Sequence, residues 1–487
     1  MKNLKDLLFG VSINAVQGST DRNINAVQFD SRKIESGDLF VAIIGLQSDG
    51  HQYIEQAENK GVFAVVCEIL PQKRLDSITY IVTDNSKHAL AIIASNYFEN
   101  PSQKLNLVGI TGTNGKTTCA SLLYQLFQYN SIPSGLISTV KICVGNSIYK
   151  ATHTTPDALT INSVLDEMVK EGITHCFMEV SSHGIDQERI SGLKFAGAVF
   201  TNLTHDHLDY HGDFISYRDT KKRLFDGLSK DAFVLINRDD KNGLFMAQNS
   251  KAKLLTYALK TGADFKGIII ENQLTGLLMR VNGVEVWSQL IGSFNASNLL
   301  AIYGTAILLK MDNLDVLKGI SSLQSVAGRF QYFMADNKIS AIVDYAHTPD
   351  ALKNVLDTIN DIRTKNESLI TVIGCGGDRD RTKRPKMGHI ATSLSDKVIF
   401  TNDNPRSEVP ESIIEDMEAG VSPVHFKKTI TILDRKQAIK TAVQLARPND
   451  IILIAGKGHE TYQEVNGQRF DFNDFEIVNH FLNQSVE

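Results

Sequence analysis

Cysteine is scarce in this sequence, and its spacing suggests no use for it. Five cysteines lie scattered through 487 residues, and no two of them form a Cys-x-x-Cys pair. An odd number of isolated cysteines argues against both a disulfide framework and a cysteine zinc site. The sequence therefore predicts a protein of a reducing compartment, and we expect it in the cytoplasm.

A strong charge of one sign and long apolar runs are also missing. The 50 basic and 55 acidic residues leave a formal charge of −5. This gives no general case for nucleic acid or an anionic membrane as a partner, although a local basic groove stays open. No apolar run approaches the roughly 18 residues that a membrane-spanning helix needs. Asp6 interrupts the apolar stretch near the N-terminus, so we expect neither a signal peptide nor membrane insertion.

What is present is an ordinary globular composition at multidomain length. Hydrophobic residues make up 42% and charged residues 22%, which excludes wholesale disorder, and the length predicts about three domains. Short apolar runs alternate with helical patterns, which predicts an α/β fold with largely parallel sheets. The loop dipeptide Asn100-Pro101 precedes the apolar run 105–110, and another unit begins at Ile342-Val343. We expect domains at residues 1–97, 98–328 and 329–487.

The segment 111–118, with the sequence TGTNGKTT, lies between an apolar run and an amphipathic helical pattern. Backbone N–H groups at the start of a helix attract phosphate, and glycines let the main chain approach it closely. In such a loop Lys116 would reach the β- and γ-phosphates, and the Thr117 hydroxyl would bind Mg²⁺. Ile110 stands where the usual pattern has its first glycine, and a chance strand–turn–helix is the alternative. The flanking pattern favours a nucleotide-binding loop.

Two further segments carry candidate metal ligands. Glu179 ends an apolar run, where its carboxylate would hold Mg²⁺ if the upstream loop binds a nucleotide; a chance strand-end glutamate is the alternative. The string 205–211 holds three histidines and two aspartates, and it is similar to the ligand motif of dinuclear metallohydrolases. Tyr210, however, separates Asp209 from His211 and breaks the adjacent Asp-His pair. A hydrolase would also leave the loop at 111–118 unexplained, so we disfavour that interpretation.

A glycine-rich turn at 374–379 follows another apolar run. Its glycines are typical of a dinucleotide site, but Arg379 occupies the third glycine position, which disfavours NAD binding. A basic run could form a solvated face or could clamp an anionic substrate, and composition does not decide between the two; it consists of Arg379, Arg381, Lys383, Arg384 and Lys386.

Further motifs follow one another in a fixed order along nearly the whole chain. They are Asp30-Ser31-Arg32, Gly37–Ala42, Thr154-Thr155-Pro156, Met178–Gly184, Thr201–Gly212, Tyr217–Lys221, Gly328–Gln331, Asp344–Pro349, Asp403–Arg406 and Gly456–Glu460. Together with the loop at 111–118, this series resembles the Mur ligase family, the ATP-dependent amide-forming enzymes of bacterial peptidoglycan assembly. Within the family it is most similar to the members that add meso-diaminopimelate to UDP-N-acetylmuramoyl-L-alanyl-D-glutamate.

The resemblance implies a fold and a reaction. The fold has an N-terminal α/β domain that grips the UDP moiety, a central P-loop ATPase domain, and a C-terminal Rossmann-like domain that brings the amino acid. ATP phosphorylates the D-glutamate carboxylate, and an amine attacks the resulting acyl phosphate. Three anionic partners must meet, so Mg²⁺ and cationic side chains are required. Such an enzyme serves cell-wall biogenesis, cell shape and cell division with small-molecule partners, and we expect a monomer.

The resemblance also assigns catalytic and nucleotide-binding residues. Lys116, Lys221 and His207 are expected to be catalytic, and Thr117, Glu179, His207 and Lys221 to hold Mg²⁺. Lys221 would act as a carbamate formed with CO₂, because an ammonium would repel the metal whereas a carbamate is an anion. The alternative is a surface lysine in the basic run 221–223. The expected ATP-binding residues are Gly112, Thr113, Asn114, Gly115, Lys116, Thr117, Thr118, Asn295, Arg329 and Asp344.

Two substrate sites complete the implied set. The positions for the UDP-muramyl-peptide are Ser31, Leu46, Gln47, Ser48, Thr154, Thr155, Ser181, Gln187 and Arg189. The positions for diaminopimelate are Arg379, Asp403, Asn404, Pro405, Arg406, Gly456 and Glu460. Arg406 is the informative one, because a guanidinium can bind the distal carboxylate that lysine lacks and would be left unpaired by lysine. A lysine-adding or other Mur enzyme, a folylpolyglutamate synthetase and an ATP-hydrolysing switch protein are the alternatives.

Overall fold

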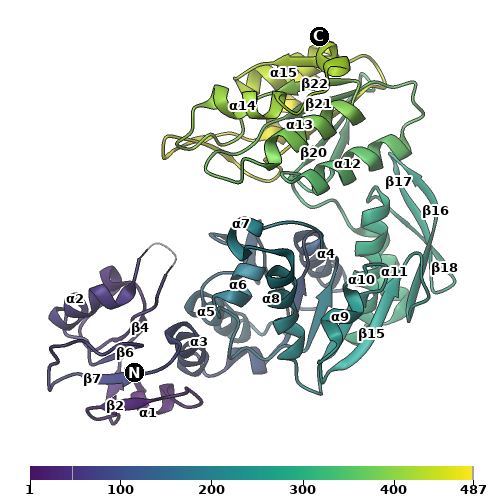
Figure 1. Ribbon diagram of the computed structural model, residues 1–487. Coiled ribbons are helices and arrows are strands. Elements are labelled where there is room, and N and C mark those ends of the chain that lie inside the picture. The colour runs from purple at the N-terminus through teal and green to yellow at the C-terminus, as the bar shows by residue number, and fades with distance from the viewer. Residues whose placement is uncertain (46–47, 485–487) are drawn as a thin grey trace.

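The computed structural model of the protein describes residues 1–45 and 48–484. Leu46 and Gln47, both expected in the uridine-nucleotide site, lie outside the described residues. Three large sheets follow one another along the chain, each with helices packed against it (Figure 1). The predicted α/β fold with mostly parallel sheets is confirmed.

The N-terminal part forms a five-stranded sheet in the order β2-β7-β6-β5-β4, in which β4 to β7 are parallel and β2 is antiparallel to β7. Its elements are β1 (Lys2–Asn3), α1 (Leu4–Leu7), β2 (Ala15–Gln17), β3 (Asn23–Ile24), β4 (Val27–Gln28), η1 (Ser31–Lys33), β5 (Leu39–Val41), η2 (Gly50–Tyr53), α2 (Ile54–Asn59), β6 (Ala64–Cys67), β7 (Thr79–Val82) and α3 (Ser86–Tyr97). The small side chains of Ala91 and Ala94 on α3 pack against Ala158. This contact joins the first sheet to the second.

The central part is built on an eleven-stranded sheet in the order β11-β10-β9-β12-β8-β13-β14-β15-β16-β17-β18. The strands from β9 to β16 in this order are parallel, and the outer strands are antiparallel. Its elements are η3 (Pro101–Gln103), β8 (Asn106–Thr111), α4 (Lys116–Tyr129), β9 (Ser134–Ile137), β10 (Lys141–Val144), β11 (Ser147–Lys150), α5 (Ala158–Lys170), β12 (His175–Glu179), α6 (Ser182–Asp186), β13 (Gly197–Phe200), α7 (Leu208–His211), α8 (Phe214–Asp226), β14 (Phe233–Asn237), α9 (Gly243–Ala247), β15 (Lys253–Ala258), β16 (Phe265–Gln273), β17 (Gly276–Val281), β18 (Val284–Ser288), α10 (Ser293–Leu308) and α11 (Asn313–Ser322). One core cluster joins the sheet to α4, α10 and α11, and a second joins it to α5 and α8.

The C-terminal part has a six-stranded sheet in the order β19-β20-β24-β21-β22-β23, parallel except for β19. Its elements are β19 (Gln331–Met334), β20 (Ser340–Asp344), α12 (Pro349–Ile362), β21 (Leu369–Ile373), α13 (Lys383–Leu394), β22 (Lys397–Phe400), α14 (Pro410–Glu418), η4 (Pro423–Lys428), β23 (Thr429–Thr431), α15 (Arg435–Leu445), β24 (Ile451–Ala455), β25 (Tyr462–Val465), β26 (Gln468–Asp471) and α16 (Asp474–Gln484). The α12 helix begins as its sequence predicts, with the Thr348 hydroxyl accepting from the N–H of Ala351 and with Pro349 in the first turn. A buried ion pair between Arg435 and Asp474 ties α15 to α16.

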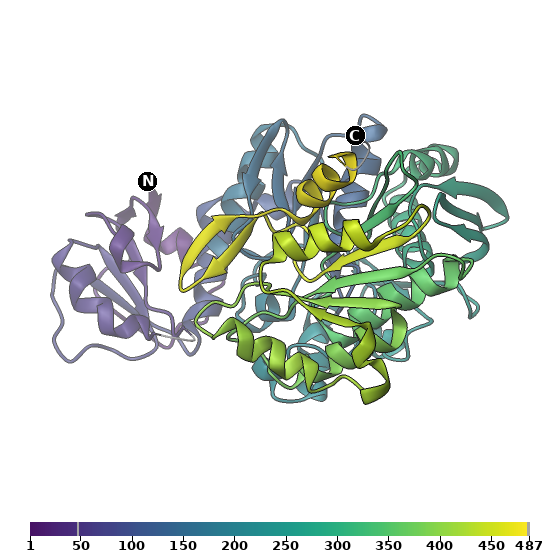
Figure 2. The same ribbon diagram turned by 90° about the horizontal axis from the view of Figure 1, so that it is seen from above.

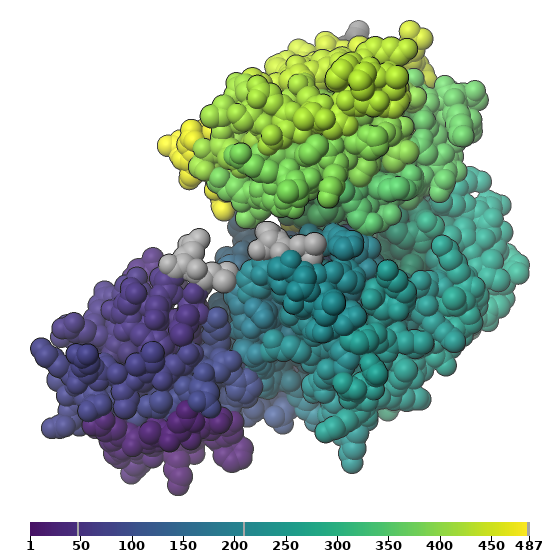
Figure 3. All heavy atoms as spheres, viewed as in Figure 1, coloured from purple at the N-terminus to yellow at the C-terminus, as the bar shows by residue number. Residues whose placement is uncertain are grey.

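The three parts meet around the central sheet. The yellow-green C-terminal part lies over the teal central part, and the purple N-terminal part lies beside it (Figures 1, 2 and 3). The carboxyl end of β8 leads into the loop at 112–115, and Arg329 and Asp350 reach that region from the C-terminal part. Within the described residues, no helix is both long and apolar enough to cross a membrane.

Candidate active site

The loop between β8 and α4 has the backbone that a phosphate-binding turn requires. Gly112 and Gly115 have φ values of +151° and +87°, which favour glycine. A Cβ atom on Gly112 would lie 2.0 Å from the Thr201 hydroxyl, so no larger residue fits there. Lys116 Nζ folds back over the loop and donates to the carbonyls of Gly112 at 2.8 Å and Thr113 at 2.7 Å. Burial lowers the pKa of Lys116.

The end of β12 lies beside the start of α4, which brings Glu179 to Thr117. The Thr117 hydroxyl donates to Glu179 Oε2 at 3.0 Å, and the Thr139 N–H donates to Oε1 at 2.7 Å. Glu179 is fully buried. A threonine hydroxyl beside a carboxylate is a set of hard oxygen donors, which suits Mg²⁺. The two residues therefore fit the metal role expected of them.

Lys221, on α8, is buried against the same loop. It is 1% exposed, and its Nζ donates to the Gly112 carbonyl at 3.1 Å and lies 4.8 Å from the centre of the Tyr217 ring. Burial, with a further contribution from the charge of Lys116, lowers the pKa of Lys221 well below its ordinary value. The alternative of a surface lysine is therefore wrong. A buried amine held neutral is a nucleophile.

His207, the third residue of the string 205–211, lies near Lys221, and the centre of its ring is 6.2 Å from that of Tyr217. Burial lowers its pKa to about 4, so the imidazole is neutral at physiological pH and can ligate a metal. Its Nε2 lies 3.6 Å from Oδ2 of Asp206. In the part of the chain that the structure describes, no group of three or more His, Cys, Asp or Glu side chains could itself hold a metal ion.

The C-terminal part reaches the loop through two side chains. Arg329 Nη2 donates to the Thr117 hydroxyl at 3.0 Å, and its guanidinium lies over the Tyr345 ring at 4.6 Å. Asp350, at the start of α12, accepts from Asn114 Nδ2 at 3.3 Å and from the Thr204 hydroxyl at 3.0 Å. These contacts hold the two parts together across the nucleotide loop.

The other expected nucleotide residues border this contact. Asp344 accepts from the Phe330 N–H at 2.6 Å, and burial raises its pKa to about 6. Asn295 accepts from Asn298, whose amide oxygen lies against Gly115. Thr113 contacts the Tyr217 hydroxyl, and Thr118 lies in the first turn of α4.

The residues expected to bind the muramyl-peptide divide between two places. Thr155 accepts from the Ser181 N–H at 2.9 Å and donates to the Ser181 hydroxyl, and Arg189 donates to the Thr155 carbonyl and to Gln187. Thr154 joins this group to the metal-site residues, because it accepts from Thr139, which also bonds to Glu179. Ser31 lies in the N-terminal part, where it donates to Gln56, and Ser48 is exposed there.

Several of the expected amino-acid residues contact one another at the carboxyl end of the C-terminal sheet. Asn404 Nδ2 donates to Glu460 Oε2 at 2.8 Å. Gly456, with φ +117°, allows a close approach, because a Cβ there would lie 2.5 Å from Asp403 Oδ2. Arg406 Nη1 donates to the Gly377 carbonyl at 2.5 Å, and the backbone N–H of Arg406 donates to the Glu464 carbonyl at 3.1 Å.

Two members of the expected amino-acid set are less closely joined to that group. Arg379 is exposed and donates to the Asp378 carbonyl at 3.5 Å, so within the described residues it has no hydrogen bond to the other members. Pro405 contributes its carbonyl, which accepts from the Glu408 N–H and lies against Gly377.

Three residues in these contacts were not singled out from the sequence. Thr139 holds both oxygens of Glu179, Asp350 bridges the two parts, and Lys457 is a fully buried lysine that donates to Asn404 and Glu460. Each acts through a contact distant in sequence. The Gly456–Glu460 motif could have drawn attention to Lys457, but nothing in it indicated burial.

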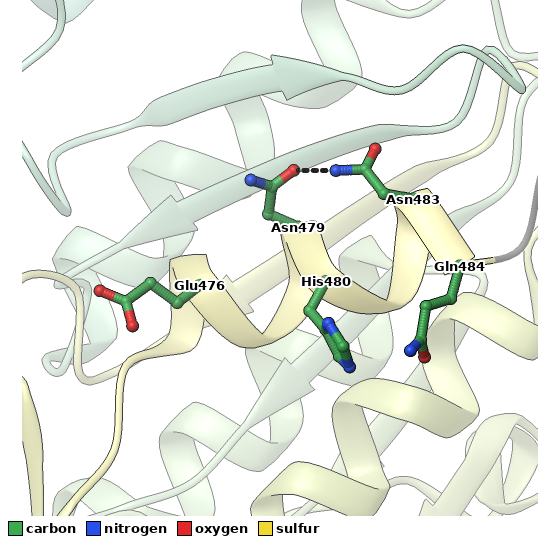
Figure 4. Close-up of a pocket in the computed structure, with 5 residues that line it drawn as sticks. All are labelled: Glu476, Asn479, His480, Asn483 and Gln484. Carbon is green, nitrogen blue, oxygen red and sulfur yellow. Dashed lines mark hydrogen bonds between the residues drawn. The ribbon is translucent and has the colours of Figure 1, made fainter.

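A pocket at the far side of the molecule has no part in this site. It is an open hollow of about 480 Å³ over α16, bordered by the side chains in Figure 4. Asn483 donates to Asn479 there at 2.9 Å. The pocket lies away from the glycine-rich loop.

A P-loop nucleotide-binding protein of three α/β parts is the class that this fold and this site define. Family models match almost the whole length in order: Mur ligase family, catalytic domain, at residues 23–100; Mur ligase middle domain at 110–306; and Mur ligase, glutamate ligase domain, at 328–458. The chain belongs to the Mur ligase family.

Its relatives include enzymes named UDP-N-acetylmuramoyl-L-alanyl-D-glutamate–2,6-diaminopimelate ligase. The one from Cytophaga hutchinsonii is 52% identical, covering 98% of this chain and 99% of its own. The one from Phocaeicola vulgatus is 50% identical, covering 98% of each. A solved structure under the same name has a TM-score of 0.71 at 32% identity, over 100% of this chain and 99% of that one. MurF ligase from Thermotoga maritima in complex with ADP shares the fold, with a TM-score of 0.62 at 18% identity over 95% and 98%.

Proposed function

We infer that the protein is an ATP-dependent ligase that adds meso-2,6-diaminopimelate to UDP-N-acetylmuramoyl-L-alanyl-D-glutamate in peptidoglycan precursor synthesis. The near-full-length likeness to ligases of that name supports the assignment. The observation that carries it is the contact of Arg329 with Thr117. It sets the part of the chain that holds the Asn404–Glu460 pocket directly against the nucleotide loop.

The reaction needs ATP because a carboxylate is a poor electrophile and oxide is a poor leaving group. The D-glutamate carboxylate oxygen attacks the γ-phosphorus, ADP leaves, and an acyl phosphate forms. The amine of diaminopimelate then attacks the acyl carbon, loses a proton, and expels inorganic phosphate as the amide forms. Lys116 would leave the loop carbonyls to bind the transferred phosphoryl oxygens, and the loop N–H groups would hold the adjacent phosphates.

The magnesium ligands that we propose are Thr117, Glu179, His207 and the carbamate of Lys221. The support for the first two is the hydroxyl–carboxylate pair at 3.0 Å, and for His207 it is an imidazole whose pKa of about 4 keeps it neutral. A bound Mg²⁺ would neutralise phosphate charge at this place.

The environment of Lys221 supports its proposed carboxylation. Burial, and next to it the charge of Lys116, lowers the pKa of Lys221 and so favours the neutral amine, whose lone pair is free. That lone pair adds to the carbon of CO₂, the amine loses a proton, and the product is an anionic carbamate. The new charge suits the neighbouring Lys116 and a divalent cation.

Selection of diaminopimelate over lysine rests on Arg406, with Arg379, Asp403, Asn404, Pro405, Gly456 and Glu460 forming the rest of the proposed pocket. A bidentate guanidinium matches the distal carboxylate, and lysine leaves it unpaired. Thr154, Thr155, Ser181, Gln187 and Arg189 would hold the muramyl-peptide, and Ser31, Leu46, Gln47 and Ser48 its uridine nucleotide. We further propose domain limits at 97/98 and 328/329, a monomer, and a cytoplasmic location, where ATP is supplied.

A phosphate-release assay tests the proposal. Phosphate should appear when ATP, UDP-N-acetylmuramoyl-L-alanyl-D-glutamate and diaminopimelate are all present. Omission of the UDP-linked substrate or of diaminopimelate should stop its release. With lysine in place of diaminopimelate, kcat/KM should fall by about 100-fold or more. Phosphate release that needs neither acceptor would indicate an ATP-hydrolysing switch instead. Hydroxylamine should trap the acyl phosphate as a hydroxamate during turnover.

A further inference from the structure

The side chain of Lys457 is the most deeply buried charged group of the amino-acid pocket. It is 0% exposed, in the turn that follows β24. Its Nζ donates to Asn404 Oδ1 at 2.9 Å and to Glu460 Oε2 at 3.0 Å, and it lies 3.9 Å from Asp403 Oδ1. A lysine is almost never buried so fully unless it is paired, and here three members of the proposed pocket surround it.

These contacts determine how Asn404 is oriented. Its Oδ1 accepts from Lys457 and also from the Glu464 N–H at 2.9 Å. With both donors on the oxygen, the amide NH₂ must point the other way, where it donates to Glu460 Oε2 at 2.8 Å. Lys457 and the Glu464 N–H together fix which of the two amide atoms faces Glu460.

The same contacts determine which oxygen of Glu460 is available. Oε2 receives both Asn404 and Lys457. Within the described residues, Oε1 is thus the oxygen left to accept a hydrogen bond from a substrate ammonium. Without Lys457, Glu460 would lose its ion pair, and the Asn404 oxygen would keep only the Glu464 N–H as a donor.

We propose that Lys457 is a positioning residue for the amino-acid substrate: it orients Asn404 and Glu460 so that Glu460 presents one carboxylate oxygen to the ammonium of diaminopimelate. This rests on the proposed function. Lys457 acts through its neighbours and touches none of the reacting atoms. Its loss therefore weakens amino-acid binding much more than it slows turnover at saturation.

The test is the Lys457→Met variant, which keeps the length of the side chain and removes its charge and donors. The KM for diaminopimelate should rise by at least about 30-fold, with the KM for ATP and for the UDP-linked substrate within about twofold of wild type. Lys428→Met is the matched control, because Lys428 lies in the same part of the protein and donates to the Thr392 and Ser395 carbonyls. It should leave all three KM values unchanged.

A second comparison separates positioning from a general structural role. If Lys457 acts through Glu460, then Lys457→Met combined with Glu460→Gln should bind diaminopimelate no more weakly than Glu460→Gln alone. Additive losses, an unchanged KM for diaminopimelate, or an equal rise in all three KM values would overturn the proposal. If Lys457→Met does not fold, Lys457→Gln is measured against the same criteria. Absence of diaminopimelate-dependent phosphate release by the wild-type protein would instead refute the proposed function.

Discussion

Lys221 in the central part and Lys457 in the C-terminal part are both buried, but their surroundings accommodate a buried amine in opposite ways. Both are almost completely removed from solvent, at 1% and 0% exposure. Lys457 is ion-paired with Glu460 at 3.0 Å, whereas Lys221 donates to a backbone carbonyl and has Lys116 as a charged neighbour. Burial of a charge is tolerated when it is paired, and otherwise the group tends to neutralise.

This difference in pairing matches the different roles proposed for the two lysines: Lys221 takes part in the chemistry, and Lys457 positions its neighbours. Burial without an ion pair lowers the pKa of an amine and favours its neutral, nucleophilic form, which suits a group that must acquire a new bond and a new charge. A paired lysine is held in place, which suits a group that must keep its neighbours oriented. The following predictions test this contrast, from the largest expected effect to the smallest.

Loss of the Lys221 amine should have the largest effect. In Lys221→Ala, kcat should fall by about 1000-fold or more, because the proposed anionic ligand of the metal is gone. Small carboxylates such as formate should restore part of the phosphate-release rate. The adjacent Lys222 is the matched control, since it pairs with Asp226 and should tolerate Lys222→Ala with little change in rate. Full activity of Lys221→Ala without added carboxylate would contradict the carbamate.

Substitution of Arg406 should change selectivity more than folding. In Arg406→Ala, kcat/KM for diaminopimelate should fall by about 100-fold, whereas that for lysine should change little, because lysine has no distal carboxylate to lose. Steady-state phosphate release with the two amino acids measures the ratio. Arg381→Ala, in the exposed basic run of the same part, is the control and should keep the wild-type ratio. Equal losses for both amino acids would show that Arg406 does not discriminate.

Loss of the hydrogen bonds that Asp350 makes to the central part should have an intermediate effect on ATP binding. Asp350→Ala removes the acceptor for Asn114 and Thr204, so the C-terminal part should close less firmly over the nucleotide loop. We expect the KM for ATP to rise by about tenfold, which corresponds to the net loss of about one hydrogen bond to a charged group. Asp357→Ala is the control on the same helix, because Asp357 pairs with Lys353 at the surface. An unchanged KM for ATP would show that the bridge does not contribute to nucleotide binding.

The partly buried acid Asp344 should show the smallest effect, as a pH dependence of stability. The pKa of Asp344 rises from 3.8 to about 6 through burial, so its stabilising contribution is complete below pH 3.8 and is lost as the pH rises through 6. Asp344→Asn is neutral throughout and can still accept from the Phe330 N–H. Its Tm relative to wild type should therefore increase by about 2–4 °C between pH 5 and pH 7. A constant difference in Tm across this range would refute the shift.

Local patterns predicted much of this molecule. The apolar run at 105–110 became β8, and the helical pattern after TGTNGKTT became α4. These predictions succeeded because strand, glycine turn and helix start depend on neighbouring residues. The same holds for the apolar run that precedes the glycine-rich turn at 374–379, which became β21.

Burial and long-range contacts could not be predicted in this way. Nothing in the run Lys221–Arg223 shows that the first lysine is buried, because that depends on how α8 packs against a loop more than 100 residues earlier. Lys457 looks like a surface residue for the same reason. Asp350 lies in the C-terminal part, and its role depends on hydrogen bonds from Asn114 and Thr204 in the central part. Arg379, expected in the pocket by resemblance, is exposed and makes no hydrogen bond to it within the described chain.

Gly112 has no side chain, yet its main chain helps to place the side chains of Lys116 and Lys221. Its carbonyl oxygen accepts from both Lys116 and Lys221, at 2.8 and 3.1 Å. Since Thr201 leaves no room for a Cβ atom, that oxygen can be held in place by glycine alone. One main-chain oxygen is thus the shared hydrogen-bond acceptor of two amines, and any shift of the turn would displace both amines at once.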